Sequence, residues 1–358
     1  MKLPLSLFKS SLLKFSFVLS SLGMVCFVGS PEESRAQGVI EGLENEVQSV
    51  LQRAQDSIVR IKVIVPVTES STKKVFPGLS VGTGFFIDTQ GHILTTASVP
   101  RGSKEVLVYW RGKAFEARYL GQDDRTNVSV LKIDATTPTL PIGEESSLKA
   151  GAMTFVVGYP SDGSLSVEYG FISDPFATRM PHFLTTTHIR SSVRVQPGHS
   201  GSPMLNRKGE VVGMVVYALD DGSSTFALPI TAARKIQSDL VRYNAPRHGW
   251  TGLTVMTHSD DLKSSEALAV RMVYRYSPAH SAGIEPGDIL KRIGNKKIQT
   301  LADLINATFY LSVGETVDFA VERQGELLSL PVRIGSRPTD QELLTMSPVE
   351  GPSPVKKP

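Results

Sequence analysis

Cysteine is almost missing from this sequence, since the 358 residues contain only one, Cys26. It lies inside the apolar run at 15–28, which follows Lys2, Lys9 and Lys14. This run is too short to span a bilayer comfortably and fits the apolar region of a secretory signal peptide. Once the signal is removed, the exported chain has no cysteine, which excludes a disulfide and a thiol nucleophile.

The residues after the apolar run predict where the signal peptide ends. Ser34 and Ala36 place small residues at the two key positions of a cleavage pattern. We therefore expect residues 1–36 to be removed and the mature, exported chain to begin at Gln37. The alternative is an uncleaved N-terminal anchor.

An excess of one charge sign is also missing. Lys plus Arg total 38 and Asp plus Glu total 35, and basic residues form no long runs. The electrostatic footprint of a nucleic-acid-binding protein is therefore absent, and we expect no nucleic-acid partner. Hydrophobic residues make up 41% of the chain, which is typical of a globular protein, and the length favours two or three domains.

The hydrophobic pattern divides the mature chain into an N-terminal helical segment, 37–56, and two folded regions. Apolar residues at helical spacing predict one amphipathic helix over 40–57. From residue 57 to about 230, short β-rich runs are separated by Gly, Pro, Asp and Ser without intervening helices, which favours an antiparallel barrel or sandwich. A helix predicted over 231–243 closes this all-β domain, which we place at 57–244.

The second folded region is smaller and is expected over 245–335, with strands and one clear helix at 301–311. The remaining segment, 336–358, contains five prolines and is predicted to be a disordered tail.

The segment 197–203, Pro-Gly-His-Ser-Gly-Ser-Pro, contains the densest potential chemistry. Glycines beside Ser200 allow a sharp turn that presents its hydroxyl, and the N–H groups of Gly198 and Ser200 can point into a common space. Such a turn can form an oxyanion hole. An isolated G-x-S-G tetrapeptide is more often an ordinary tight turn than a nucleophile site.

Three blocks in order resemble the HtrA/Deg family of exported trypsin-like serine proteases with a PDZ domain. They are GTGFFIDTQGHILTTASVP (82–100), DDRTNVSVLKID (123–134) and PGHSGSPMLNRKGEVVGM (197–214). The resemblance extends from about Leu43 to Ile334 and implies an all-β trypsin-like double β-barrel followed by a smaller α+β PDZ domain. It also implies periplasmic or cell-envelope protein quality control, and a homo-oligomer, with a trimer built through the N-terminal segment.

The catalytic positions depart from the family pattern. Ser200 matches the nucleophile, but Ser98 stands at the position of the base histidine and Asn127 at that of the carboxylate. A serine hydroxyl cannot accept a proton at neutral pH, and an uncharged amide cannot stabilise an imidazolium. Loss of the base removes roughly 10⁴–10⁶ of the rate in serine proteases. The resemblance therefore predicts a pseudoprotease.

Two further departures concern the surroundings of the nucleophile. Thr225 stands where a glycine is usual in the strand that lines the specificity pocket, and its β-branched side chain should narrow that pocket. Ser202 replaces the second glycine after the nucleophile.

Another histidine could supply the missing base. The seven candidates are His92, His182, His188, His199, His248, His258 and His280. His92 lies at the far end of the strand that leads to Ser98, and His188 is expected to pack or to face solvent. His199 is expected to be a partly exposed turn residue that points away from Ser200. No His, Asp or Glu pair has convincing metal-ligand spacing, so we expect neither a metal nor a cofactor.

The second region keeps the recognition features of a PDZ domain. Residues 277–290, SPAHSAGIEPGDIL, resemble the long PDZ block, and 301–311 the helix beside the groove. The expected carboxylate-binding loop consists of Trp250, Thr251, Gly252 and Leu253. Gly252 allows backbone N–H groups to face a peptide carboxylate, and the strand 253–256 would pair with the peptide. The alternative is a unit that only packs on the barrel.

We therefore expect an exported pseudoprotease that binds unfolded or extended polypeptides through a non-catalytic barrel and protein C-termini through its PDZ domain. One alternative is an active serine endopeptidase of periplasmic quality control with a rewired base. Another is a PDZ scaffold whose barrel supports an envelope assembly.

Overall fold

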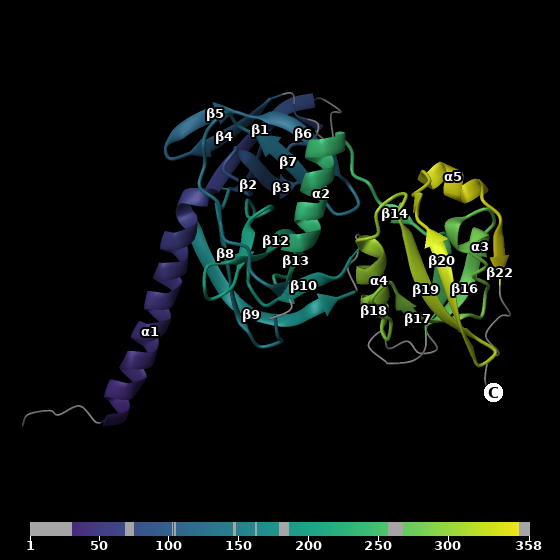
Figure 1. Ribbon diagram of the computed structural model, residues 1–358. Coiled ribbons are helices and arrows are strands. Elements are labelled where there is room, and N and C mark those ends of the chain that lie inside the picture. Colours follow the sequence, from purple (N-terminus) through teal and green to yellow (C-terminus); the bar gives the residue numbers. More distant parts are fainter. Residues whose placement is uncertain are drawn as a thin grey trace, which may run out of the picture. The chain divides into compact units, whose positions relative to one another are not determined.

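The computed structural model describes residues 31–350, apart from 69–74, 102, 104, 146–147, 162, 179–185 and 257–267. It divides into two compact units, Met1–Glu44 and Asn45–Pro358 (Figure 1). The apolar run of the expected signal peptide lies outside the described residues, and cleavage after Ala36 stays a prediction. Within the described ranges, no helix combines the length and the apolar character needed to cross a membrane.

The N-terminal helix α1 spans Pro31–Ala54 and is followed by the 3₁₀ turn η1, Gln55–Ser57. The helix that the apolar spacing predicts is therefore present. Val50 and Ala54 are completely buried, and Val47 and Leu51 pack against the same hydrophobic core. The last turns of α1 thus belong to the fold of the unit that begins at Asn45.

Seven antiparallel strands form the first sheet, in the order β5-β4-β1-β2-β3-β7-β6. They are β1 (Ile58–Thr68), β2 (Val75–Phe86), β3 (His92–Thr96), β4 (Val106–Trp110), β5 (Lys113–Glu116), β6 (Arg118–Asp123) and β7 (Val128–Lys132). The register of β3 and β7 pairs Thr96 with Val128. Since Ser98 and Asn127 lie just beyond this pair, the sheet brings these two predicted site residues together.

Six strands form the second barrel, which is closed in the order β10-β13-β12-β11-β8-β9. They are β8 (Met153–Gly158), β9 (Ser166–Ala177), β10 (His188–Ser191), β11 (Pro203–Leu205), β12 (Val211–Ala218) and β13 (Thr225–Pro229). The predicted closing helix is α2, Ile230–Tyr243, which packs against β6 and β7 of the first sheet and β12 and β13 of the second barrel. The predicted double β-barrel is confirmed, with one closed barrel and one half-barrel.

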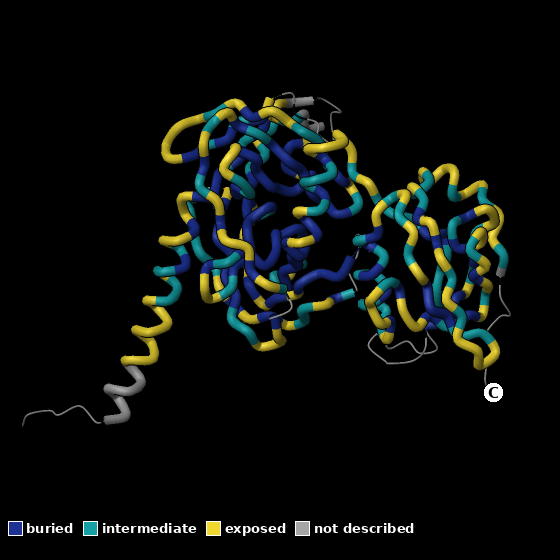
Figure 2. The backbone as a smooth tube through the Cα atoms, in the orientation of Figure 1, coloured by how far each residue is buried: buried dark blue, intermediate teal, exposed yellow. Residues whose placement is uncertain are grey.

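A smaller domain of strands and short helices follows and confirms the predicted α+β PDZ fold. Its main sheet has the order β15-β16-β17-β19-β20, with β18 paired to β17, and β14 and β21 form a separate two-stranded sheet. These strands are β14 (Gly249–Trp250), β15 (Leu253–Met256), β16 (Ala269–Tyr274), β17 (Ile289–Ile293), β18 (Lys296–Lys297), β19 (Thr316–Arg323), β20 (Glu326–Arg333) and β21 (Gly335–Ser336). Its helices are α3 (Pro278–Ser281) and α4 (Leu301–Phe309). The Thr300 side chain caps α4 and Asp303 reciprocates, which fixes where the helix begins. Figure 2 shows the buried residues gathered inside the two barrels and in the core of the smaller domain.

The C-terminal tail differs from the prediction of disorder over 336–358. Up to Glu350 it contains α5 (Asp340–Thr345) and β22 (Pro348–Glu350), and 351–358 lie outside the described residues. Thr339 and Glu342 form a capping box that starts α5, and β22 pairs with β16, which places Val349 opposite Val273. Proline content misled the prediction because Pro348 stands at the first position of a short strand, where proline is tolerated.

The core of the smaller domain provides a stability test. Leu290 is 1% exposed and Leu327 is 68% exposed, although both are leucines of one sheet. We expect Leu290→Ala to lower the free energy of unfolding by about 2–5 kcal/mol, because it removes buried methyl groups and leaves a cavity. The matched Leu327→Ala should change it by less than about 0.5 kcal/mol. Chemical denaturation followed by circular dichroism measures both, and equal effects would contradict the assigned core.

Candidate functional site

Ser200 lies in the turn between β10 and β11, and two glycines give that turn its shape. Gly198 has φ 103° and Gly201 has φ 86°, conformations that favour glycine. A Cβ on Gly198 would lie 2.5 Å from the Tyr159 carbonyl oxygen. A Cβ on Gly201 would lie 2.3 Å from the carbonyl oxygen of Thr83. The turn therefore requires both glycines, as the sequence predicts.

Thr83, a buried residue of β2, fixes the turn from the first sheet. Its N–H donates to the carbonyl of Ser200 (3.0 Å), and its hydroxyl donates to the carbonyl of Gly198 (2.9 Å). The Tyr159 N–H donates in turn to this hydroxyl (2.9 Å). Sequence reasoning missed Thr83, although its place between two glycines of the first block was a usable signal.

The N–H groups of Gly198 and Ser200 are the predicted oxyanion-hole donors. Both residues use their carbonyl groups as acceptors for Thr83. Neither N–H donates a hydrogen bond to any residue in the described part of the chain. Two backbone donors on either side of His199 are thus available to a ligand.

The hydroxyl of Ser200 is joined to two others. Its Oγ lies 2.9 Å from Thr96 Oγ1, which lies 3.1 Å from Ser98 Oγ. Thr96 is completely buried, Ser200 is half-buried and Ser98 is exposed. The structure therefore brings Ser98 and Ser200 together through Thr96, which sequence reasoning missed. Strand alternation gave no signal for it, because β3 ends at Thr96 and Ser98 lies in the turn that follows.

Asn127 occupies a left-handed conformation with φ 56°, which asparagine tolerates better than most residues. Its Oδ1 accepts a hydrogen bond from the Ser98 N–H (3.2 Å), and its Nδ2 donates to the carbonyl of Val216 (3.2 Å). Both ends of the amide are thereby engaged. Asn127 positions the backbone of Ser98 and links the first sheet to β12 of the second barrel.

None of the five histidines that the structure describes is hydrogen-bonded to Ser200; His182 and His258 lie outside the described residues. His92 pairs through Nδ1 with Asp88 Oδ2 (2.7 Å) at the far end of β3, as its place in the strand predicts. His248 pairs with Asp123, with 3.1 Å between Nε2 and each carboxylate oxygen.

His199 corrects one prediction, because it is completely buried and is not a partly exposed turn residue. Its Nε2 lies 3.3 Å from Ser166 Oγ, while its Nδ1 has no hydrogen-bond partner among the described residues. Its Nδ1 and the buried Ser202 Oγ both lie within 3.0 Å of the point where a Cβ on Gly158 would stand. The absence of a side chain at Gly158 is what lets the ring turn inward.

Thr225 is buried in β13, where its hydroxyl donates to the carbonyl of Val193 (2.7 Å). The side chain is therefore fixed against the segment that leads to the serine turn. The predicted narrowing of a specificity pocket stays a prediction.

The predicted peptide-binding loop surrounds Gly252, whose φ is 75°. The carbonyl of Gly252 accepts from the Tyr274 N–H (2.8 Å), and that of Thr251 accepts from the Ala279 N–H (2.8 Å). A Cβ on Gly252 would lie 2.2 Å from the Cβ of Ser277, so glycine is required. The N–H of Gly252 donates to no other described residue and is available to a ligand.

The strand that follows this loop has the position that peptide binding needs. β15 stands at one end of the sheet order, so within the described ranges one of its edges is unpaired. Leu253 packs against the same core as Leu304 of α4, while the ring of Trp250 lies 6.1 Å from that of Tyr274. For metals, no group of three or more His, Cys, Asp and Glu side chains is suitably placed in the described part of the chain.

Comparison with protein families supports both domains. A model of the trypsin-like peptidase domain matches residues 82–214, and a PDZ domain model matches residues 252–334. A "Probable periplasmic serine endoprotease DegP-like" from Hahella chejuensis is 30% identical over 287 residues, 77% of this chain and 61% of the relative. A protein of the same name from Pseudomonas putida is 30% identical over 73% of this chain and 57% of the relative. The chain thus spans about three fifths of the curated relatives it matches.

Solved structures share the fold. The HtrA-type protease AlgW with a tripeptide has a TM-score of 0.69 and 22% identity, over 82% of this chain and 98% of that one. A serine endoprotease from Yersinia pestis has a TM-score of 0.58 and 24% identity over the same shares.

The two buried histidines near the serine turn predict a pH dependence of stability. Burial lowers the pKa of His188 and of His199 from 6.5 to about 4. The unfolded chain binds these protons more readily, so stability is complete above pH 6.5 and is lost as the pH falls from 6.5 towards 4. The loss should reach about 3 kcal/mol for each histidine.

Denaturant unfolding between pH 4 and 7 measures this dependence. His188→Gln and His199→Asn should each flatten the curve, whereas His280→Asn, at an exposed position, should leave it unchanged. A curve that stays equally steep without either buried histidine would contradict the assignment.

Proposed function

Because the chain is an HtrA/DegP-like protein, with a trypsin-like peptidase domain followed by a PDZ domain, we propose that it is an exported pseudoprotease. Its barrel binds unfolded or extended polypeptides without efficient hydrolysis, and its PDZ domain binds protein C-termini. The supporting observation is the chain of hydroxyls that joins Ser200 to Thr96 and Ser98. Attack by Ser200 needs a group that accepts its proton, and a neutral hydroxyl cannot do so at neutral pH.

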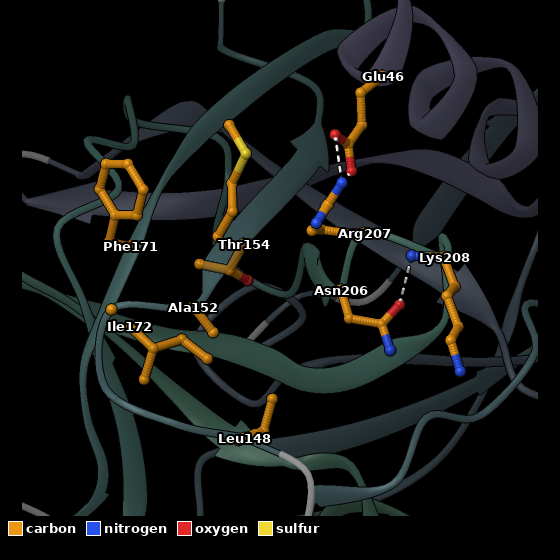
Figure 3. Close-up of a pocket in the computed structure, with 11 residues that line it drawn as sticks. Glu46, Leu148, Ala152, Thr154, Phe171, Ile172, Asn206, Arg207 and Lys208 are labelled. Atoms are coloured by element: carbon orange, nitrogen blue, oxygen red, sulfur yellow. Dashed lines mark hydrogen bonds and ion pairs between the residues drawn. The ribbon is translucent and has the colours of Figure 1, made fainter. Parts of the chain in front are cut away.

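The location and the assembly are part of the same proposal. The apolar N-terminal run and the relatives named periplasmic support export to the periplasm or cell envelope. A homo-oligomer is supported by the apolar surface of β9, where Tyr169 and Phe171 are about half exposed. The trimer built through the N-terminal segment is proposed from the resemblance alone. Phe171 borders a cavity of about 480 Å³ with Leu148 and Ile172 in its lining and the Glu46–Arg207 ion pair on its rim (Figure 3). Exposed apolar surface of this kind favours contact with another chain.

The second candidate is an active serine endopeptidase of protein quality control. The names of the relatives and the retained nucleophile position, with two available N–H groups beside it, favour this function. It requires a base other than the five described histidines. A PDZ scaffold is the third candidate, and it requires a barrel that binds nothing.

The proposal predicts that the protein does not cleave a destabilised protein substrate at neutral pH. The reason is that, among the described residues, the side chain bonded to the Ser200 hydroxyl is the neutral hydroxyl of Thr96, which cannot act as a base at neutral pH. Incubation of the full mature chain with casein, followed by gel electrophoresis over hours, measures this. Ser200→Ala is the matched control, and cleavage that disappears in this variant would establish the endopeptidase instead.

A repaired variant makes the test sharper. Ser98→His combined with Asn127→Asp restores the residues that the resemblance places at these positions. If the turn and its donors are preorganised, a fluorophosphonate probe should label Ser200 far more strongly than in the unmodified protein. The triple variant with Ser200→Ala should not be labelled. A folded double variant without any gain would contradict an intact oxyanion hole.

The PDZ loop predicts recognition of a free C-terminus. A peptide with an apolar last residue should bind with a Kd on the order of micromolar, and amidation of its C-terminus should weaken binding clearly. Gly252→Ala should weaken it as well, because the new methyl group meets Ser277. Gly325→Ala is the matched control, since that glycine also has positive φ but open space around it. Calorimetry measures binding, and equal affinity for acid and amide would contradict the assignment.

A further inference from the structure

We propose that the serine turn of the second barrel binds a carboxylate, and that its ligand is the C-terminal carboxylate of an extended polypeptide. This rests on the proposed function, because a working protease would act on internal bonds at this place. It adds a second site for chain ends, apart from the PDZ loop.

One serine hydroxyl of this cluster always keeps a proton that it can donate to a ligand. Two hydrogen bonds join the hydroxyls of Ser200, Thr96 and Ser98. Thr96 is completely buried, so its proton needs an acceptor within this group. Thr96 therefore donates to one serine and accepts from the other. The serine that accepts keeps its own proton, and both serines are accessible to solvent.

The backbone adds two donors beside the hydroxyl of Ser200, which is the free hydroxyl when Thr96 donates to Ser200 and accepts from Ser98. The carbonyl groups of Gly198 and Ser200 are both bonded to Thr83, and their N–H groups donate to no described residue. An ionised carboxylate is a pure acceptor with two oxygens. One oxygen can accept from the N–H groups and the other from the serine hydroxyl. Hydrogen bonds to an ionised acceptor are about twice as strong as neutral ones.

The charge of the site suits an anion. Asn127, where the resemblance implies an aspartate, carries no charge, and both ends of its amide are used within the protein. Asp123, at the end of β6 closest in sequence to Asn127, is also paired, with His248. A fixed unpaired carboxylate would repel the ligand, and the described contacts place none beside Ser200.

The same donor set favours a chain end over an internal peptide bond. An internal bond offers one carbonyl oxygen and adds an N–H group that needs an acceptor. A C-terminal carboxylate offers two acceptor oxygens and no such N–H. Around Ser200 the structure supplies donors, with Ser98 in place of the residue that would accept or transfer a proton.

The test uses the full mature chain with Gly252→Ala, which weakens binding at the competing PDZ loop. The probes are a fluorescent peptide of fixed sequence with a free C-terminal carboxylate, its C-terminal amide, and acetate as competitor. Fluorescence anisotropy should show that the acid binds about ten times more tightly than the amide. Ser98→Ala combined with Ser200→Ala should abolish this preference. Ser173→Ala, an exposed serine of β9, is the matched control and should retain it.

Asn127→Asp provides a second, independent variant. A carboxylate restored behind Ser98 should weaken binding of the acid about tenfold and leave the amide unchanged, in protein whose fold is verified by circular dichroism. Equal binding of acid and amide before substitution would overturn the proposal, and so would a preference that survives both sets of variants. Acetate that competes with micromolar affinity would identify a small carboxylate as the ligand and overturn the assignment to a polypeptide.

The outcome separates this proposal from the proposed function. Mass spectrometry of the peptide after incubation reports whether it has been cleaved. Cleavage that depends on Ser200 would overturn the pseudoprotease, whatever the binding preference. An intact peptide without a preference for the acid would overturn only the carboxylate site.

Discussion

Two hydrogen bonds from Thr83 hold the serine turn of the second barrel against β2 of the first sheet. The N–H and hydroxyl of this residue occupy the carbonyls of Ser200 and Gly198, and both glycines of the turn adopt conformations that a side chain would block. The N–H groups of Gly198 and Ser200 share their peptide planes with the carbonyls of Pro197 and His199, which accept from the N–H groups of Ser161 (2.8 Å) and Ser202 (2.9 Å). Because N–H and C=O point in opposite directions in a planar trans peptide, these bonds leave both N–H groups facing the other way, towards a ligand.

The chemistry of the site then follows from its proton acceptors. A nucleophilic serine becomes reactive when a neighbouring group takes its proton, and the group beside Ser200 is the hydroxyl of Thr96. Asn127 still links β12 to the backbone of Ser98. This position therefore keeps a structural role, although its side chain carries no charge. A polypeptide can be held by the donors that remain, since binding needs no proton transfer. The shape of the site therefore does not depend on its reactivity. Backbone hydrogen bonds and packing give the site its shape, whereas proton transfer would depend on the side chains at positions 98 and 127.

The sequence predicted those features of the fold and the site that depend on residue type and on the order of segments along the chain. Short β-rich runs predicted an antiparallel barrel or sandwich, and the resemblance carried by the three ordered blocks added the double barrel, the PDZ domain and the site positions of Ser98 and Asn127. Thr96 and Thr83 were missed because their importance comes from strand register and from a contact between sheets. His199 was misjudged because the space that buries its ring is created by Gly158, a residue 41 positions away along the chain. The prediction of a disordered tail was wrong because proline content does not reveal the capping box that starts α5 or the pairing of β22 with β16.

The serine turn and the PDZ loop reach the same chemistry by the same means. In each, a glycine with positive φ allows carbonyl groups to be bonded inward, so that backbone N–H groups are left for a ligand. Backbone amides do not titrate in the physiological range, whereas an imidazole changes charge within it. Recognition by such donors should therefore vary little between pH 6 and 8, provided that the peptide carboxylate stays ionised. The proposed binding of polypeptide ends at both places would therefore persist under conditions that switch a histidine-dependent protease off.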